Sequence, residues 1–308
     1  MTMPGPAWHL EVFATNNGFE PFTAFQDSLT DTATVALDAA LTHVLAVRGI
    51  ELVRTEWRKP LGDGLHEFRV RHTADEIRRM FGDEAPGVAP PHGESVLLRV
   101  FAHFHGQRIV LLLSGYDKQR DPSTRTQQKE IKYAQKKSQS LEGTRDQAQG
   151  REAQGPAQRG VSPWKTEQLN STFVQRSTPL LTAYGIKHIS RIMVRNTYPA
   201  SCRRRVPAVA RSYEVAAASR LARLSPAAGR QGRVFEEAYD VAVQLMEMRQ
   251  RRGMTQLQLA EATGIAQSEI SRIERGGANP TEKTIHRLAD ALGAELKIVE
   301  RDPSVTVE

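Results

Sequence analysis

The hydrophobic pattern of the first 140 residues alternates between the period of strands and that of helices. Residues 65–72 and 95–104 place apolar and polar side chains in turn, as half-buried strands do, so Glu67, Arg69 and Arg71 would share one face of the first strand. Residues 108–116 form a continuous apolar run typical of a central strand, whereas residues 32–47 repeat apolar side chains at helical spacing. The pattern predicts an α+β fold of helices packed on a small antiparallel sheet. Further expected elements are a strand at residues 8–13 and helices at residues 22–29 and 126–138.

Residues 234–308 show the spacing of short amphipathic helices instead. A first helix ends at Gly253 after a basic last turn. Thr255 and Gln258 then have the form of a capping box that opens a second helix, and Gly264 supplies the positive φ of a tight turn. This half is therefore predicted to be an all-α domain. It is completed by helices at residues 267–275 and 285–292 and by a short strand at residues 295–300.

The middle of the chain, residues 141–233, differs in composition from both ends. It opens with a segment rich in Gly, Gln, Ser, Arg and Ala that has almost no large apolar side chain. Such a segment cannot bury enough surface to offset the entropy of ordering it, so we expect a long, basic, disordered linker, within which residues 216–224 could form a short helix. The predicted division is thus residues 1–140, 141–233 and 234–308. Met193 could mark the start codon of a second gene. An alternative origin for this segment is therefore translated sequence between two genes that were once separate.

Charge and cysteine content narrow the classes of protein. The 308 residues carry 42 Lys and Arg against 35 Asp and Glu, a formal net charge of +7, with one cysteine. A single cysteine excludes an intrachain disulfide and favours a reducing compartment. No secretory leader or long apolar span is apparent, so we expect a cytoplasmic protein without a membrane partner. The excess of positive charge lies in residues 141–233, and residues 234–308 are acidic, so net charge alone gives little support for nucleic-acid binding.

The predicted helix at residues 267–275 has two different faces. Ile270 and Ile273 point one way, toward the core. The opposite face, which begins at the helix N-terminus, carries short polar side chains and one arginine. Such side chains suit edge-on reading of bases in a DNA major groove. The residues of this reading face are Gln267, Ser268, Ser271 and Arg272.

Three motifs in this region together resemble the Cro/CI-type (XRE), lambda-repressor-like helix-turn-helix family. They are GMTQLQLA from Gly253, GIAQSEISRIERG from Gly264, and NPT from Asn279. The resemblance implies that the reading face contacts bases, while Gln256 and Asn279 contact backbone phosphates. It also implies operator DNA as a partner and a homodimer through this domain. Ala266 departs from the Ser or Thr cap usual in the family.

The first 140 residues resemble the RelE/HigB toxin superfamily, and its phage-derived, Gp49-like HigB branch in particular. The motifs are KPLGDGLHEFR from Lys59, LRV around Arg99, and the strand end Tyr116-x-Lys118. The resemblance implies a ribosome-dependent mRNA endonuclease, in which an RNA 2′-hydroxyl attacks the adjacent phosphate. Such chemistry needs cations around the developing charge, together with a proton acceptor and donor.

The resemblance implies roles for six residues. Arg69 and Arg99 would clamp the phosphate, with Lys59 and Lys118 as further cations. Glu67 or His103 would move protons. His66 stands where the branch has an aromatic residue, and residues 73–94 form an inserted acidic loop.

The two resemblances together predict a type II toxin–antitoxin fusion of HigB-like and HigA-like parts. Its expected partners are operator DNA, mRNA on the ribosome, and an intramolecular toxin–antitoxin contact that restrains the endonuclease. We expect no cofactor and no metal. The alternative is a helix-turn-helix transcriptional regulator whose N-terminal α+β domain is a non-catalytic ligand- or partner-binding module.

Overall fold

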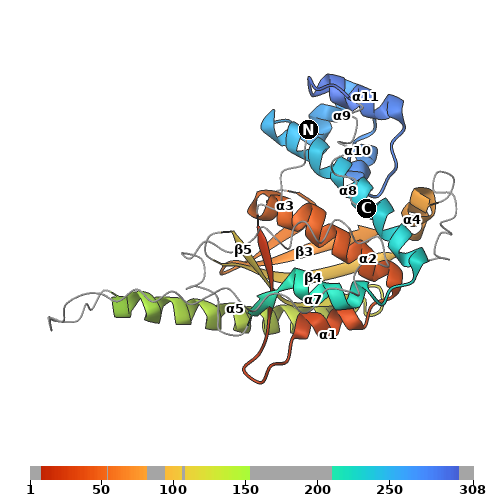
Figure 1. Ribbon diagram of the computed structural model, residues 1–308. Coiled ribbons are helices and arrows are strands. Elements are labelled where there is room, and N and C mark those ends of the chain that lie inside the picture. The colour runs from red at the N-terminus through yellow and green to blue at the C-terminus, as the bar shows by residue number, and fades with distance from the viewer. Residues whose placement is uncertain (1–7, 54, 82–93, 106–107, 153–209, 298–308) are drawn as a thin grey trace, which may run out of the picture.

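The computed structural model describes residues 8–53, 55–81, 94–105, 108–152 and 210–297, with only the backbone described for residues 140–152. Its centre is a six-stranded sheet in the order β2-β3-β4-β5-β1-β6 (Figure 1). Helices α1 and α2 cover one face of this sheet, and helix α5 lies along the other. The strands are β1 (His9–Phe13), β2 (Arg58–Gly62), β3 (Leu65–His72), β4 (Val96–His105), β5 (Ile109–Asp117) and β6 (Ala210–Ser212).

The sheet is mixed, not antiparallel as predicted. Strand β1 pairs with β5 in parallel, whereas the other neighbouring strands are antiparallel. Hydrophobic alternation shows which residues form strands but not the direction in which two distant strands pair. The predicted α+β class is otherwise what the first part of the chain shows.

Strand β2, which the pattern did not predict, forms a tight hairpin with β3. Its two-residue turn is Asp63–Gly64, with φ of 48° and 66°. Both positive angles fit the type I′ turn that suits the twist of a hairpin, and Asp-Gly is a common sequence for it. Pro60 removes one backbone donor from β2, which is tolerated because β2 is an edge strand.

One long helical run fills most of the core on the first face of the sheet. It begins as α2 (Asp31–Ala39), passes through a π-helical segment (Ala40–Leu45), and ends in α3 (Ala46–Arg48) and a 3-10 turn (Gly49–Leu52). In the described part of the chain, Asp31–Leu52 is the one run long and apolar enough to cross a membrane; 72% of its apolar window is buried in the fold. Helix α1 (Pro21–Asp27) packs beside it.

Two other helices differ from the expected elements. Helix α5 (Thr124–Glu152) continues well past residue 138 and projects beyond the sheet (Figure 1). Helix α4 (Ala74–Phe81) stands where the sequence predicted an acidic loop. It forms because Thr73 and Glu76 exchange capping hydrogen bonds, and because Ile77, Met80 and Phe81 are buried in the core.

Residues 210–233, predicted as part of a disordered linker, belong to the fold. They form β6, α7 (Tyr213–Leu221) and the start of α8 (Pro226–Arg251). Tyr213 is buried, donates to Asp38 (2.7 Å), and accepts from Gln26 (3.2 Å). The short helix considered at residues 216–224 overlaps α7, but the average composition of the middle segment gave no sign that it packs in a core, although Ser225-Pro226 is a recognisable helix start. The rest of the predicted linker, from residue 153 to 209, lies outside the described residues.

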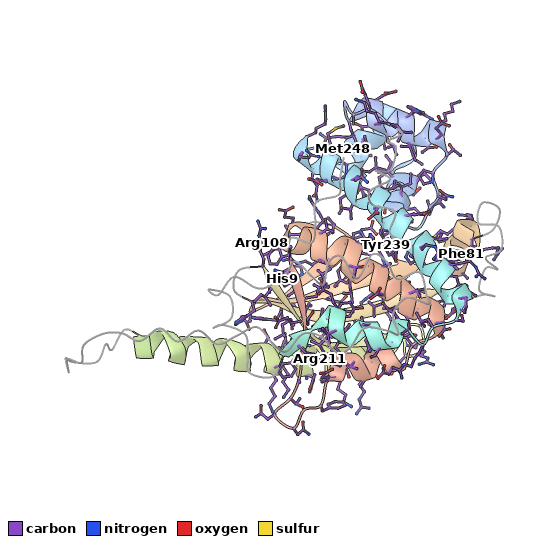
Figure 2. All side chains as sticks on the ribbon, viewed as in Figure 1. His9, Phe81, Arg108, Arg211, Tyr239 and Met248 are labelled. Atoms are coloured by element: carbon purple, nitrogen blue, oxygen red, sulfur yellow. The ribbon has the colours of Figure 1, made fainter. Side chains whose placement is uncertain are left out.

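Helix α8 contributes to two hydrophobic cores, so the predicted boundary at residue 234 falls inside one continuous helix. Phe235, Tyr239 and Val243 pack in the core of the sheet domain. Leu245 packs in a second core, with Met248 against it, formed by α9 (Gln256–Thr263), α10 (Gln267–Glu274) and α11 (Glu282–Ala291). Figure 2 shows Tyr239 of α8 and Phe81 of α4 in the sheet domain, and Met248 of α8 in the helical part. Residues 294–297 form no strand, and the rest of the strand predicted at 295–300 lies outside the described residues.

Polar contacts fix α8 against the long helical run. Gln231 and Thr32 are 3.2 Å apart, and Arg48 donates to Gln250 (2.9 Å). His43 Nδ1 lies 2.7 Å from Asp240 Oδ1. Burial lowers the pKa of His43, but the hydrogen bond and charge of Asp240 outweigh this effect and leave its pKa raised.

This ion pair predicts a pH-dependent contribution to stability. Because the folded-state pKa of His43 is raised above its unfolded value, the contribution is present below about pH 6.5 and is lost as pH rises through the folded pKa. In urea unfolding, the free energy of unfolding of wild type relative to His43→Gln should rise by about 1 kcal/mol or less when pH is lowered from 9 to 5. The matched control is His286→Gln, an exposed histidine 3.6 Å from Glu282. A wild-type advantage that is equal at both pH values would contradict the prediction.

Candidate nucleic-acid interfaces

The four-helix part of the chain has the local geometry of a helix-turn-helix. Thr255 and Gln258 form the predicted capping box of α9. Gly264 ends α9 with φ 65°, the left-handed conformation that the turn requires. Helix α10 follows without a side-chain cap at Ala266, and its Ile270 and Ile273 are buried in the second core. The sequence predicted each of these features.

Hydrogen bonds hold the start of the reading face in place. Gln267 is exposed and donates to Gln256 (2.8 Å), which in turn donates to Glu274 (2.9 Å). Glu274 is buried and accepts two hydrogen bonds from Arg249, at 2.5 and 2.7 Å. Gln267 is therefore linked to the domain core through a chain of polar side chains.

The other predicted DNA contacts occupy two kinds of environment. Ser268 and Asn279 are exposed, and Arg272 is partly exposed and paired with Glu269. Ser271 differs from the prediction because it is buried, at 8% exposure, and donates to Glu56 of the sheet domain. The helical period correctly placed Ser271 on the same side of α10 as Gln267, but it carried no information about which other domain would cover that position.

Comparison with known proteins supports the assignment of this region. Residues 245–298 match the family model of a helix-turn-helix. An uncharacterized HTH-type transcriptional regulator of Haemophilus influenzae is 41% identical over 56 residues, which is 18% of this chain and 57% of that protein. The uncharacterized HTH-type transcriptional regulator y4dJ of Sinorhizobium fredii is 41% identical over 46 residues, which is 15% of this chain and 60% of that protein. The chain thus spans about three fifths of each relative, and no solved structure matches it. Residues 245–298 therefore form a helix-turn-helix domain.

The residues predicted to act on RNA gather mainly on the second face of the sheet. Arg69 lies directly opposite Arg99 across β3 and β4, and Arg99 lies opposite Tyr116 of β5. Lys59 of the edge strand lies opposite Glu67. Paired positions project to the same face, so these five side chains share one surface. We call this set, together with Arg71 and Lys118, the cationic face.

Glu67 is the central carboxylate of the cationic face. One of its oxygens, Oε1, lies 2.7 Å from Nε of Arg69 and 3.2 Å from Nε of Arg99. Glu67 is buried at 1% exposure, whereas the side chain of Arg69 is 26% exposed. Burial lowers the pKa of Arg99 and raises that of Tyr116 to about 12. Glu67 is thus placed to orient two guanidinium groups, a different role from the predicted proton transfer.

The remaining predicted residues are spread around this cluster. Lys59 is exposed on the edge strand, and Lys118 follows β5, its N–H donating to Leu97 (2.8 Å). His103 is buried at 3% exposure beneath α5, with Nδ1 2.7 Å from the hydroxyl of Ser138. His103 in this state has no exposed ring for proton transfer to an RNA. In the residues that the structure describes, no group of His, Cys, Asp and Glu could hold a metal ion.

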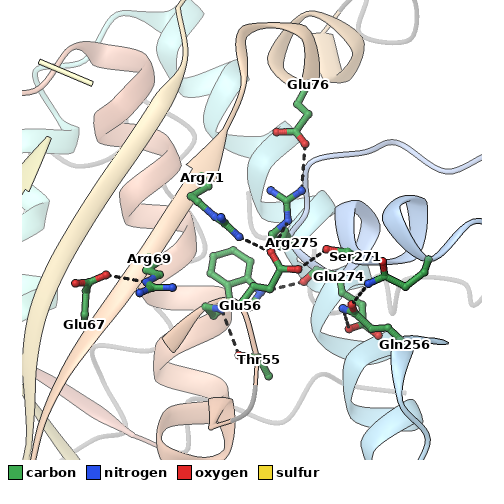
Figure 3. Close-up of polar contacts among 12 residues, drawn as sticks. Thr55, Glu56, Glu67, Arg69, Arg71, Glu76, Gln256, Ser271, Glu274 and Arg275 are labelled. Carbon is green, nitrogen blue, oxygen red and sulfur yellow. Dashed lines mark hydrogen bonds and ion pairs between the residues drawn. The ribbon is translucent and has the colours of Figure 1, made fainter. Parts of the chain in front are cut away.

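Sequence reasoning missed the residues that join the two interfaces. Glu56 pairs with Arg71 of the cationic face and lies 3.1 Å from Arg275, which follows α10 (Figure 3). Trp57 donates its indole N–H to the carbonyl of Glu274 (2.9 Å). Only Arg71 had a signal, as a third residue of the alternating strand; nothing in the sequence pattern singled out Glu56.

Proposed function

We propose that this protein is a transcriptional regulator that binds operator DNA through α10. The observation that carries the proposal is the chain from Gln267 through Gln256 to Glu274, which positions an exposed amide at the N-terminus of the recognition helix. A glutamine amide can pair with adenine in the major groove, and the partly exposed Arg272 can pair with guanine. Ser268 adds a third base contact, while Gln256 and Asn279 meet phosphates. The expected compartment is the cytoplasm.

We also propose that the regulator binds DNA as a homodimer through its helix-turn-helix domain. Residues 234–308 are acidic overall, and the affinity of a protein for DNA rests largely on phosphate neutralisation. Two copies on adjacent half-sites would double the number of specific contacts.

Removal of the Gln267 amide tests whether α10 contacts bases through this residue. Gln267→Ala should weaken binding to a duplex selected by the wild-type chain by about 1–3 kcal/mol, or roughly 5- to 150-fold, and relax the preference at one base pair. Fluorescence anisotropy at fixed salt measures the effect. Gln244→Ala is the matched control, because Gln244 is exposed and its amide donates to the Asp240 carbonyl one turn earlier in α8 (3.2 Å). Equal affinities for both variants would count against base reading by Gln267.

For the sheet domain, we propose that the cationic face binds and cleaves mRNA, so that the chain is a toxin–antitoxin fusion. The supporting observation is that Arg69 and Arg99 lie opposite each other and share one carboxylate. Two guanidinium groups fixed in this way can stabilise the charge that develops when a 2′-hydroxyl attacks its phosphate. Tyr116, beside Arg99, is buried and stacked on Phe101, so its ring is not open to a base, and Arg69 is the partly exposed group of this cluster. The test is cleavage of a translated mRNA, and its loss when both arginines are replaced.

A second function for the sheet domain is that of a non-catalytic module that binds a ligand or a partner. Two observations favour it: Arg99 is already occupied by Glu67, and Glu56 contacts the recognition helix. Under this reading, replacing Arg69 and Arg99 changes regulation but removes no RNA cleavage.

A further inference from the structure

The sheet domain is docked on the C-terminal end of the recognition helix. Glu56 accepts a hydrogen bond from the hydroxyl of Ser271, and its carboxylate also pairs with Arg275 (3.1 Å). Glu76 lies 3.4 Å from the same arginine. We call these contacts, together with the hydrogen bond from Trp57 to the Glu274 carbonyl, the α10 dock (Figure 3).

Apolar packing behind the α10 dock makes it a built contact. The Trp57 ring is buried, with its centroid 5.7 Å from that of Phe68 and 5.3 Å from that of Tyr239. Gly276, at φ 66°, lies so close to Tyr239 that a Cβ there would stand 2.4 Å from the ring. The chain after α10 thus approaches the sheet domain at a distance that only glycine permits.

We propose that the sheet domain and DNA compete for α10, so that the docked form described here is an autoinhibited state. The proposal rests on the proposed DNA binding. Ser271 lies one helical turn from Gln267 on the same face, yet it is 8% exposed and bonded to a carboxylate. A duplex that received α10 in its major groove would bring phosphates toward Glu56 and Glu76, and these two carboxylates, which already share Arg275, would repel them.

The competition has a reciprocal consequence. If only undocked molecules bind DNA, the apparent DNA affinity is the affinity of the undocked form multiplied by the undocked fraction. By linkage, DNA binding shifts the equilibrium toward the undocked form by the same factor. Release leaves Glu56 paired with Arg71 alone, because both residues lie in the sheet domain.

Removal of the Glu56 carboxylate in the full-length chain tests the competition. Affinity is measured by fluorescence anisotropy at one salt concentration, on a 30-base-pair duplex from upstream of the chain's own coding sequence and on a random duplex of equal length. Glu56→Ala should bind the upstream duplex about tenfold more tightly than wild type. Asp75→Ala is the matched control, because it removes one acidic charge at an exposed, i,i+3-paired position of the same domain. It should change affinity less than twofold.

Hydrogen exchange on the wild-type chain gives a second readout that does not depend on a variant. Saturating DNA should raise exchange at residues 55–58 and at the amides of Gly276 and Gly277. Binding by wild type without that change, or equal affinities for Glu56→Ala and Asp75→Ala, would overturn the competition while leaving DNA binding in place. If neither wild type nor Glu56→Ala binds either duplex, the proposed function itself fails, and the competition with it.

Discussion

Arg249→Met is expected to lower the free energy of unfolding by about 3–5 kcal/mol, because it strands a buried carboxylate. Arg249 gives Glu274 two hydrogen bonds, and both side chains are at most 9% exposed. Its Nη1 also donates to the carbonyl of Met254 (2.8 Å), the residue before the α9 cap. Urea unfolding followed by circular dichroism measures the loss. Gln256 also bonds Glu274, so DNA affinity should fall with stability.

The double variant Arg249→Met/Glu274→Leu separates the cost of an unpaired charge from the value of the pair. Two apolar side chains of similar size often replace a buried ion pair at little cost, so most of the lost stability should return. Arg251→Met is the surface control, since the side chain of Arg251 is 69% exposed and 3.8 Å from Glu247. It should cost less than about 1 kcal/mol. A single variant as mild as this control would show that Glu274 is not stranded without Arg249.

Joint replacement of Arg69 and Arg99 by alanine should abolish RNA cleavage, with a loss of about 100-fold or more. Electrostatic donors aimed at developing charge commonly contribute this much individually. The assay is cleavage of a translated mRNA in a cell extract, together with growth arrest on expression. It should be run on the full chain and on residues 1–252, because α7 and α8 supply core residues of the sheet domain. Residues 1–140 alone would lack that part of the core.

The matched control for the double arginine variant is Arg78→Ala/Arg79→Ala. It removes the same charge from exposed positions of α4 and should leave cleavage unchanged. If the wild-type fragment of residues 1–252 is soluble yet neither cleaves RNA nor arrests growth, the proposal that the sheet domain is a toxin is wrong. If wild type shows no RNA cleavage and the double arginine variant alters operator binding, the sheet domain is a ligand- or partner-binding module.

Local signals in the sequence were sufficient for the helix-turn-helix domain. The Thr255 capping box, the Gly264 turn and the period of Ile270 and Ile273 each act within a few residues, so each could be predicted from the sequence. The mixed sheet could not, because the parallel pairing of β1 with β5 depends on how distant segments meet. The same holds for Tyr213, whose burial against α1 and α2 is invisible in the composition of its neighbourhood.

The candidate sites show the same division. Strand alternation correctly put Glu67, Arg69 and Arg71 on one face, and the register then brought Arg99 beside them. The burial of Glu67 and the cover over His103 come from packing against other elements, which a single sequence does not record. Ser271 illustrates this limit best, since its helical face was predicted and its covering domain was not.

The short strand β6 determines how long the edge of the sheet stays open during synthesis. Without β6, the hydrophobic strand β1 would be an open sheet edge able to pair with another chain. Three residues cover it, and Arg211 among them bonds Glu20 through two nitrogens at 2.7 Å, which makes the new edge short and charged. Because β6 follows β1 by some 200 residues, a ribosome must translate two thirds of the protein before this edge is closed. The nascent chain is therefore most exposed to self-association in that interval, and chains ended before residue 210 would keep the exposure permanently.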